Sequence, residues 1–129
     1  LQEGQIWEAV MFAAHNKVDN YIATIDVNGQ QIDGPVSKVV ALENLEDKFK
    51  AFHWTVLHMN GHDMENILAT LDKAKSLTGQ GKPICILMKT EMGKGVDFME
   101  GSHEWHGIAP NDEQLAKALG QLEETLGDY

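Results

Sequence analysis

The chain has 129 residues and a formal net charge of −10 at pH 7, from 10 basic and 20 acidic residues. With 43% apolar and 23% charged residues, its composition is that of one globular domain and argues against a disordered chain. The negative charge repels phosphate backbones and anionic membranes, and no apolar run approaches the ~20 residues that span a bilayer. We therefore expect neither a nucleic acid nor a membrane as partner. The single cysteine, Cys85, excludes an internal disulfide and predicts a reducing, cytoplasmic setting.

Helices and strands are expected to alternate along the chain. Apolar residues recur at spacings of three and four in four segments, which predict helices at 4–15, 45–52, 64–77 and from 112 to about 126. Apolar runs rich in β-branched residues predict strands at 21–27, 54–59 and 84–89. This alternation is typical of parallel βαβ units, so the predicted fold class is α/β with a parallel sheet. Because the pattern begins with a helix, we expect the fold to be incomplete at its amino terminus.

Two of the predicted helices carry further detail. Asp63 is the expected N-cap of the helix at 64–77, and the buried face of that helix is expected to hold Ile67, Leu68 and Leu71. The last helix is expected to present an apolar stripe that consists of Leu115, Leu119, Leu122 and Leu126.

Asn28 and Gly29 follow the first predicted strand, where ligands of open parallel sheets bind. A side-chain amide followed by glycine suits a phosphate or a hard cation such as Mg²⁺. The same dipeptide is also a common turn, so the pattern alone leaves both interpretations open.

The histidines give a weaker signal. His58 and His62 are four residues apart, but they straddle a predicted strand end and a turn, so they do not share a helical face as zinc ligands would. His103 and His106 lie in the glycine-rich segment 90–110, without the spacing of a zinc protease. The aromatic residues of that segment predict an ordered loop. Its histidines would serve as phosphate donors or proton-transfer groups, or lie solvated on the surface.

Three stretches, in order and at compatible spacing, resemble transketolase. They are LQEGQIWEA at 1–9, IDVNGQQIDG at 25–34 and GSHEWHG at 101–107. The resemblance covers essentially the whole chain and is closest to the amino-terminal, thiamine-diphosphate-binding subunit of split, two-chain transketolases. In thiamine-diphosphate enzymes a Gly-Asp-Gly motif is followed by one helix, one strand and an asparagine, which here is Asn28. The chain begins just after that motif. The resemblance therefore implies that residues 1–129 are the carboxy-terminal part of the diphosphate-binding domain, a three-layer sandwich with a parallel sheet.

The resemblance also implies roles for individual residues. Asn28 would coordinate Mg²⁺ through its side-chain oxygen and touch the diphosphate, and Gln30 would offer its backbone carbonyl to the metal. Ile32 would pack near the thiazolium ring of the cofactor. His106 would contact both diphosphate and substrate. Glu3 would link two active sites across a dimer.

Two further residues are placed near this site by the resemblance. Asp26 would support it without binding the cofactor, and His103 would lie close to it.

The activity implied is transfer of a two-carbon ketol unit from a ketose phosphate to an aldose phosphate, with thiamine diphosphate and Mg²⁺, as in the pentose phosphate pathway. The implied partners are the pyrimidine-domain subunit, sugar phosphates and further copies that form a dimer or heterotetramer. The pyrimidine domain and the aspartate of Gly-Asp-Gly lie outside this chain. We therefore expect the 129 residues alone to be inactive and to bind the cofactor weakly or not at all.

Three other interpretations compete with this one. Another thiamine-diphosphate family, such as 1-deoxyxylulose-phosphate synthase or a 2-oxo-acid dehydrogenase component, is disfavoured by Trp105-His106-Gly107. A non-catalytic remnant is favoured by the missing aspartate. A metal- or protein-binding module would use the loop histidines.

Overall fold

The computed structural model describes residues 1–123 of the chain. These residues form two compact units. The first unit consists of Leu1–Asn28 and Val40–Thr90, and the second consists of Gly29–Val39 and the chain from Glu91 onward.

A three-stranded parallel sheet forms the centre of the first unit. Its strands are β1 (Ile22–Val27), β4 (Thr55–Asn60) and β5 (Ile84–Lys89), in the order β1-β5-β4. The last strand in the sequence therefore lies in the middle. The predicted parallel α/β arrangement is confirmed, although β1 begins one residue later than expected and β4 is shifted by one residue toward the carboxyl end.

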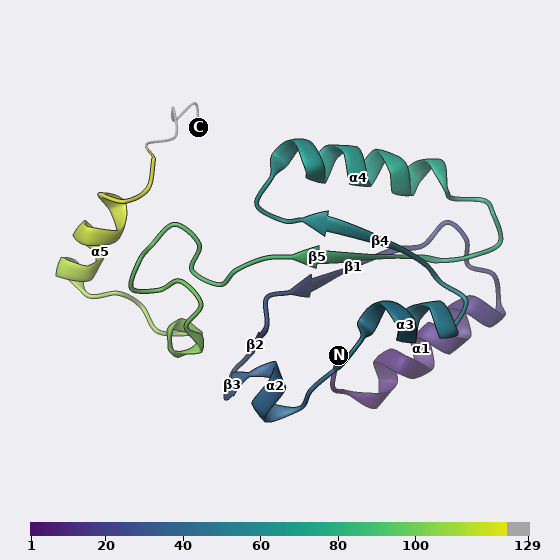
Figure 1. Cartoon of the computed structure of the whole chain (residues 1–129), viewed down its shortest axis with the longest axis horizontal. Coiled ribbons are helices and arrows are strands. Elements are labelled where there is room, and N and C mark those ends of the chain that lie inside the picture. The colour runs from purple at the N-terminus through teal and green to yellow at the C-terminus, as the bar shows by residue number, and fades with distance from the viewer. Residues whose placement is uncertain (124–129) are drawn as a thin grey trace. The chain divides into compact units, whose positions relative to one another are not determined.

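Helices cover both faces of this sheet, which gives the predicted three-layer sandwich. Helices α1 (Gly4–His15) and α3 (Leu45–Ala51) lie on one face and α4 (Met64–Ser76) lies on the other (Figure 1). The side chains of β5 alternate between the two cores that result. Cys85 and Leu87 join the core beneath α1 and α3, whereas Ile84 and Ile86 join the core beneath α4.

Helix α4 begins as predicted, but one residue of its predicted buried face is exposed. The Asp63 carboxylate caps the helix by accepting a hydrogen bond of 3.1 Å from the backbone N–H of Asn66. Ile67 and Leu71 pack on the sheet, whereas Leu68 is 58% exposed. The buried stripe runs from Ile67 through Leu71 to Ala74. Leu68 follows Ile67 directly, and one residue corresponds to a rotation of about 100° around a helix, so its side chain points away from this stripe.

The second unit contains a short antiparallel hairpin, β2 (Gln30–Gln31) and β3 (Gly34–Pro35), followed by α2 (Val36–Val39). The sequence predicted turn residues here and no helix. The 90–110 segment is ordered, as predicted, and includes the 3₁₀-helix η1 (His103–Trp105). Trp105 anchors it: its ring lies 5.2 Å from that of Phe98, and its Nε1 donates a hydrogen bond of 2.8 Å to the Phe98 carbonyl.

Helix α5 (Asp112–Leu119) is shorter than predicted. It begins with a capping box, in which Asn111 and Gln114 each bind the other's backbone N–H. Gly120 follows its last turn, and Gly is a poor helix former. Leu115, Leu119 and Leu122 of the predicted stripe are exposed and Ala118 is buried, while Leu126 lies outside the described residues.

Candidate functional site

Asn28 lies directly after β1, at the carboxyl edge of the parallel sheet. Its Nδ2 donates a hydrogen bond of 3.0 Å to Oδ2 of Asp26. The other carboxylate oxygen of Asp26 accepts a hydrogen bond from the hydroxyl of Thr90, which follows β5. The amide nitrogen of Asn28 therefore faces Asp26, and covalent geometry places its amide oxygen on the opposite side. Sequence reasoning missed Thr90, because its contact with Asp26 joins residues 64 positions apart.

Glu3 is the N-cap residue of α1, as its position before the predicted helix implied. Its side chain does not cap the helix, and its carboxylate instead accepts a hydrogen bond from Nε2 of Gln5. Both side chains are exposed. The carboxylate thus sits on the surface of the first unit, at the end of α1 where the helix dipole favours negative charge.

Gln30 and Ile32 belong to the hairpin of the second unit. The side chain of Gln30 donates a hydrogen bond of 2.9 Å from Nε2 to the backbone carbonyl of Gly101. This bond ties the hairpin to the glycine-rich loop, so the side-chain amide of Gln30 has a structural partner. Ile32 lies in the turn of the hairpin and is 69% exposed.

The loop histidines lie beside this hairpin, since η1 is in contact with β3. The hydroxyl of Ser102 accepts a hydrogen bond of 3.3 Å from the N–H of Glu104 and starts the 3₁₀ turn. The N–H of His106 donates one of 3.0 Å to the carbonyl of His103 and closes it. The imidazole of His106 is exposed and that of His103 is half-buried. The structure thus brings His103, His106 and Gln30 into one unit.

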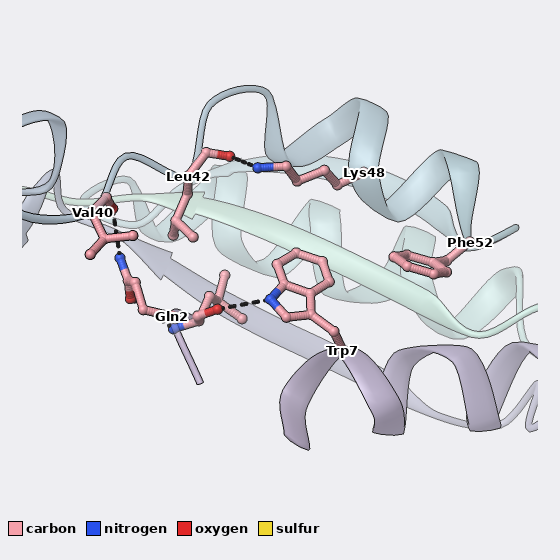
Figure 2. Close-up of a pocket in the computed structure, with 7 residues that line it drawn as sticks. Gln2, Trp7, Val40, Leu42, Lys48 and Phe52 are labelled. Atoms are coloured by element: carbon pink, nitrogen blue, oxygen red, sulfur yellow. Dashed lines mark hydrogen bonds between the residues drawn. The ribbon is translucent and has the colours of Figure 1, made fainter. Parts of the chain in front are cut away.

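A separate cavity of about 360 Å³ lies between the start of α1 and α3 in the first unit (Figure 2). Its polar side chains bind backbone carbonyls: Trp7 Nε1 donates to Leu1 at 3.0 Å, Gln2 Nε2 donates to Val40 at 3.2 Å, and Lys48 Nζ donates to Leu42. Asn28, Glu3 and the predicted residues of the hairpin and loop do not line it. It is therefore an apolar hollow apart from the predicted site residues.

In the part of the chain that the structure describes, the histidines do not gather into a metal centre. Within residues 1–123, no group of three or more His, Cys, Asp or Glu side chains is placed to hold a metal ion. Nε2 of His58 lies 2.9 Å from the Glu46 carboxylate instead. The pKa of Glu46 is lowered mainly by its hydrogen bond from Lys50 and next by its hydrogen bond with His58. In the same described part of the chain, no helix has the length and apolar character needed to cross a membrane.

Known proteins resemble the chain over almost its whole length. The family model described as "Transketolase, thiamine diphosphate binding domain" matches residues 1–125. The 6-deoxy-6-sulfo-D-fructose transketolase subunit SqwG of a Clostridium species is 43% identical over 94% of this chain and 43% of that protein. One of the apulose-4-phosphate transketolase subunits of Phocaeicola vulgatus is 40% identical over 96% of this chain and 43% of that protein. The chain thus spans less than half the length of these relatives.

A solved structure gives the same result for the fold. The transketolase of Campylobacter jejuni superimposes with a TM-score of 0.83 at 39% identity, over 93% of this chain and 18% of that one. The resemblance inferred from residues 1–9, 25–34 and 101–107 is therefore confirmed. The chain belongs to the family of transketolase thiamine-diphosphate-binding domains.

Proposed function

We propose that this chain forms the carboxy-terminal part of the diphosphate-binding domain of a transketolase. The enzyme would transfer a two-carbon ketol unit from a ketose phosphate to an aldose phosphate, using thiamine diphosphate and Mg²⁺. The observation that supports this most directly is the position of Asn28. It lies at the carboxyl end of a parallel strand, and its amide nitrogen is held by Asp26.

The donor atoms at Asn28 and Gln30 fit Mg²⁺, which prefers oxygen ligands such as amide and backbone carbonyls. Asn28 would supply its side-chain oxygen, because its nitrogen is already bound to the Asp26 carboxylate. Gln30 would supply its backbone carbonyl, because its side chain holds Gly101. The carboxylate of Asp26 adds negative charge beside Asn28, which further favours a cation.

The other predicted residues would act on the cofactor, the substrate or the partner copy. His106 carries an exposed imidazole on an ordered loop, so it would donate hydrogen bonds to phosphate oxygens. Ile32, exposed on the hairpin turn, would offer an apolar contact to the thiazolium ring. Glu3 would reach the second active site of a dimer from the exposed start of α1. When bound, thiamine diphosphate supplies an electron sink for carbanion chemistry.

The partners follow from the same proposal. The relatives described above are named as transketolase subunits, which supports an assembled dimer or heterotetramer with a separate pyrimidine-domain subunit. Their names refer to a sulfo-sugar and to apulose 4-phosphate, so the proposed substrate class is ketose and aldose sugar phosphates and sulfonates, including those of the pentose phosphate pathway. The buried free thiol of Cys85 suits the cytoplasm. Residues 1–129 alone would lack a complete site and be inactive.

The test uses the full-length protein that contains this chain, assembled with its pyrimidine-domain subunit. Calorimetry with thiamine diphosphate at saturating Mg²⁺ is expected to show binding, and a panel of ketose and aldose phosphates is expected to show two-carbon transfer. Asn28→Ala should weaken cofactor binding about 10–100-fold, the usual cost of disturbing a metal site. The melting temperature of the cofactor-free protein should stay the same, because Gly29 retains the freedom of the turn. Wild-type affinity in Asn28→Ala would refute the metal role.

A further inference from the structure

We propose that Thr90 and Asp26 are positioning residues that orient the amide of Asn28 toward its metal, and that Gly61 holds Thr90 in place. This inference rests on the proposed role of Asn28 as a Mg²⁺ ligand. It assigns a function to two residues, Thr90 and Gly61, that follow other strands of the sheet and are far from Asn28 in the sequence.

The strand register brings these residues to one edge. The ladder ends with Val27 paired to Lys89 and Lys89 paired to Asn60. Beyond that row, the N–H of Gly61 donates a hydrogen bond of 2.8 Å to the carbonyl of Lys89, and the N–H of Thr90 lies 3.5 Å from the carbonyl of Val27. The next residues of the three strands, Asn28, Thr90 and Gly61, therefore continue the sheet side by side.

The Asp26 carboxylate determines which way the Asn28 amide faces. An ionised carboxylate has only acceptors, so it binds the amide nitrogen of Asn28 and repels the amide oxygen. A rotation of 180° about the last side-chain bond would exchange the nitrogen and the oxygen and bring the oxygen against the Asp26 carboxylate, which that carboxylate opposes. A metal ligand that spends part of its time with its nitrogen toward the cation binds that cation more weakly.

Thr90 in turn holds Asp26. Its hydroxyl donates to the carboxylate oxygen that Asn28 does not use, so the carboxylate is fixed at both ends. Charge-assisted hydrogen bonds of this kind are stronger than neutral ones. Thr90 is half-buried, whereas Asp26 is exposed, and so the more enclosed residue holds the more exposed one.

Gly61 makes the position of Thr90 possible. A Cβ atom at residue 61 would lie 2.5 Å from Cγ2 of Thr90 and 2.8 Å from Cγ of Met88, which is closer than real side chains approach. The Thr90 methyl group thus occupies the space that a larger residue would fill. Because the rotamers of β-branched side chains are restricted, the fixed methyl group also fixes the direction of the hydroxyl.

The decisive variant is Thr90→Val, which keeps the shape of the side chain and removes the hydroxyl. The probe is Mn²⁺, measured by electron paramagnetic resonance as it binds to the assembled two-subunit enzyme with saturating thiamine diphosphate. We expect Thr90→Val to weaken Mn²⁺ binding about 10-fold, as expected for partners of metal ligands. Thr90→Ser, which restores the hydroxyl, should bind Mn²⁺ nearly as the wild type does. The matched control is Thr24→Val on the exposed part of β1, which should leave binding unchanged.

Two measurements distinguish the positioning role of Thr90 from a merely structural one. They are the melting temperature of the cofactor-free protein and the Mn²⁺ binding of Thr90→Val combined with Asn28→Ala. Thr90→Val should melt as the wild type does without cofactor, and it should add no further loss of Mn²⁺ binding once Asn28 is Ala. If Thr90→Val lowers the melting temperature, Thr90→Ala and Thr90→Ser are compared in its place, and the difference in Mn²⁺ binding between them decides.

Failure of the inference and failure of the proposed function give different results. If Asn28→Ala binds Mn²⁺ like the wild type, the proposed metal role is wrong. If Asn28→Ala weakens binding but Thr90→Val does not, the positioning role alone is wrong. The same conclusion follows if Thr90→Ser fails to restore binding, or if Thr90→Val costs as much with Ala at residue 28 as with Asn.

Discussion

The indole Nε1 of Trp54 donates a hydrogen bond of 3.0 Å to the backbone carbonyl of Val10, inside the core that the sheet shares with α1 and α3. The Trp54 ring also packs edge-on against Phe49, with ring centroids 5.5 Å apart. One side chain directly before β4 thus binds α1 and contacts α3. The core therefore holds helix α1 against the sheet, and Glu3 is the N-cap residue at the start of this helix.

Trp54→Phe is expected to lower the free energy of unfolding by about 1–3 kcal/mol. The change removes one buried hydrogen bond and leaves part of the indole volume empty. Denaturant unfolding, followed by circular dichroism, measures the effect. Phe12→Leu is the control, because Phe12 on the same helix α1 is 67% exposed and its truncation should cost less than about 0.5 kcal/mol. Equal effects of the two substitutions would contradict the assignment of Trp54 to the core.

The predicted elements of the first unit were recovered because their patterns are local. Apolar runs gave the three strands to within one residue, and helical spacing gave α1 and α4. Strand order was not predicted, although one signal existed: Ile84–Lys89 is nearly continuously apolar and becomes the buried central strand. Helix α2 was missed because its four residues carry no period to detect.

The residues of the candidate site also differ in whether the sequence alone could identify them. The motif around Asn28 was recognisable because its residues are neighbours in the sequence. Thr90 and Gly61 were not, because their contacts depend on the strand register, which brings residues from three different strands to one row. Likewise, the bond between Gln30 and Gly101 joins positions 71 residues apart. Long-range pairs of this kind leave no pattern in a single sequence.

Asn28→Asp is expected to retain the metal while weakening thiamine diphosphate binding. The substitution keeps an oxygen for the cation but adds a negative charge beside the diphosphate. It also replaces a nitrogen that lies 3.0 Å from Oδ2 of Asp26, so two carboxylates would repel one another there. Calorimetric titration of the assembled enzyme with thiamine diphosphate, and electron paramagnetic resonance with Mn²⁺, separate the two effects. Wild-type affinity for the diphosphate would contradict the assignment.

Cys85 is expected to resist thiol reagents as long as the protein is folded. Burial raises the pKa of its thiol to about 12, so almost no thiolate is present at pH 8. Reaction with Ellman's reagent at pH 8 should be slow in buffer and should reach one thiol per chain only in denaturant. Rapid labelling of the native protein would show that the start of β5 opens. Thr55→Cys, at the less buried start of β4, gives the reactive reference.

The contact between Asp97 and α5 should weaken at acid pH. Hydrogen bonds from Gln121 and then Lys117, at 2.9 and 3.0 Å, lower the pKa of the Asp97 carboxyl below its ordinary value of 3.8. Because the folded-state pKa is the lower one, this stabilisation is present above pH 3.8 and is lost as the pH falls through that value toward the folded-state pKa.

The difference in melting temperature between the wild type and Asp97→Asn measures this contribution. It should be largest near pH 5 and shrink as the pH falls below 3.8. Asp72→Asn is the control, because its side chain is 80% exposed and its partner in the described part of the chain, Lys75, lies 3.7 Å away. A difference that stays constant over this pH range would show that the carboxylate does not hold α5.

Gly93→Ala is expected to disrupt the loop that carries His103 and His106. Gly93 has a φ of 70°, and a Cβ there would lie 2.5 Å from the backbone oxygen of Met99, which cannot move aside as a flexible side chain would. Gly107→Ala is a matched control. Gly107 also has a positive φ, of 85°, but a Cβ there would meet nothing within 4 Å. Both variants share the strain of about 1–2 kcal/mol that a side chain causes in the left-handed region, so their difference isolates the clash.

Hydrogen exchange of two amides in the loop reports the outcome. The N–H of Val96 donates to the carbonyl of Gly93 at 3.1 Å, and the N–H of Gly101 donates to the carbonyl of Met92 at 2.8 Å. Both should exchange faster in Gly93→Ala than in Gly107→Ala, because the clash pushes the two sides of the loop apart. The bond between Gln30 and Gly101 depends on the same loop, so loosening should spread to the hairpin. Equal exchange in the two variants would mean that the close approach of Gly93 and Met99 does not hold the loop together.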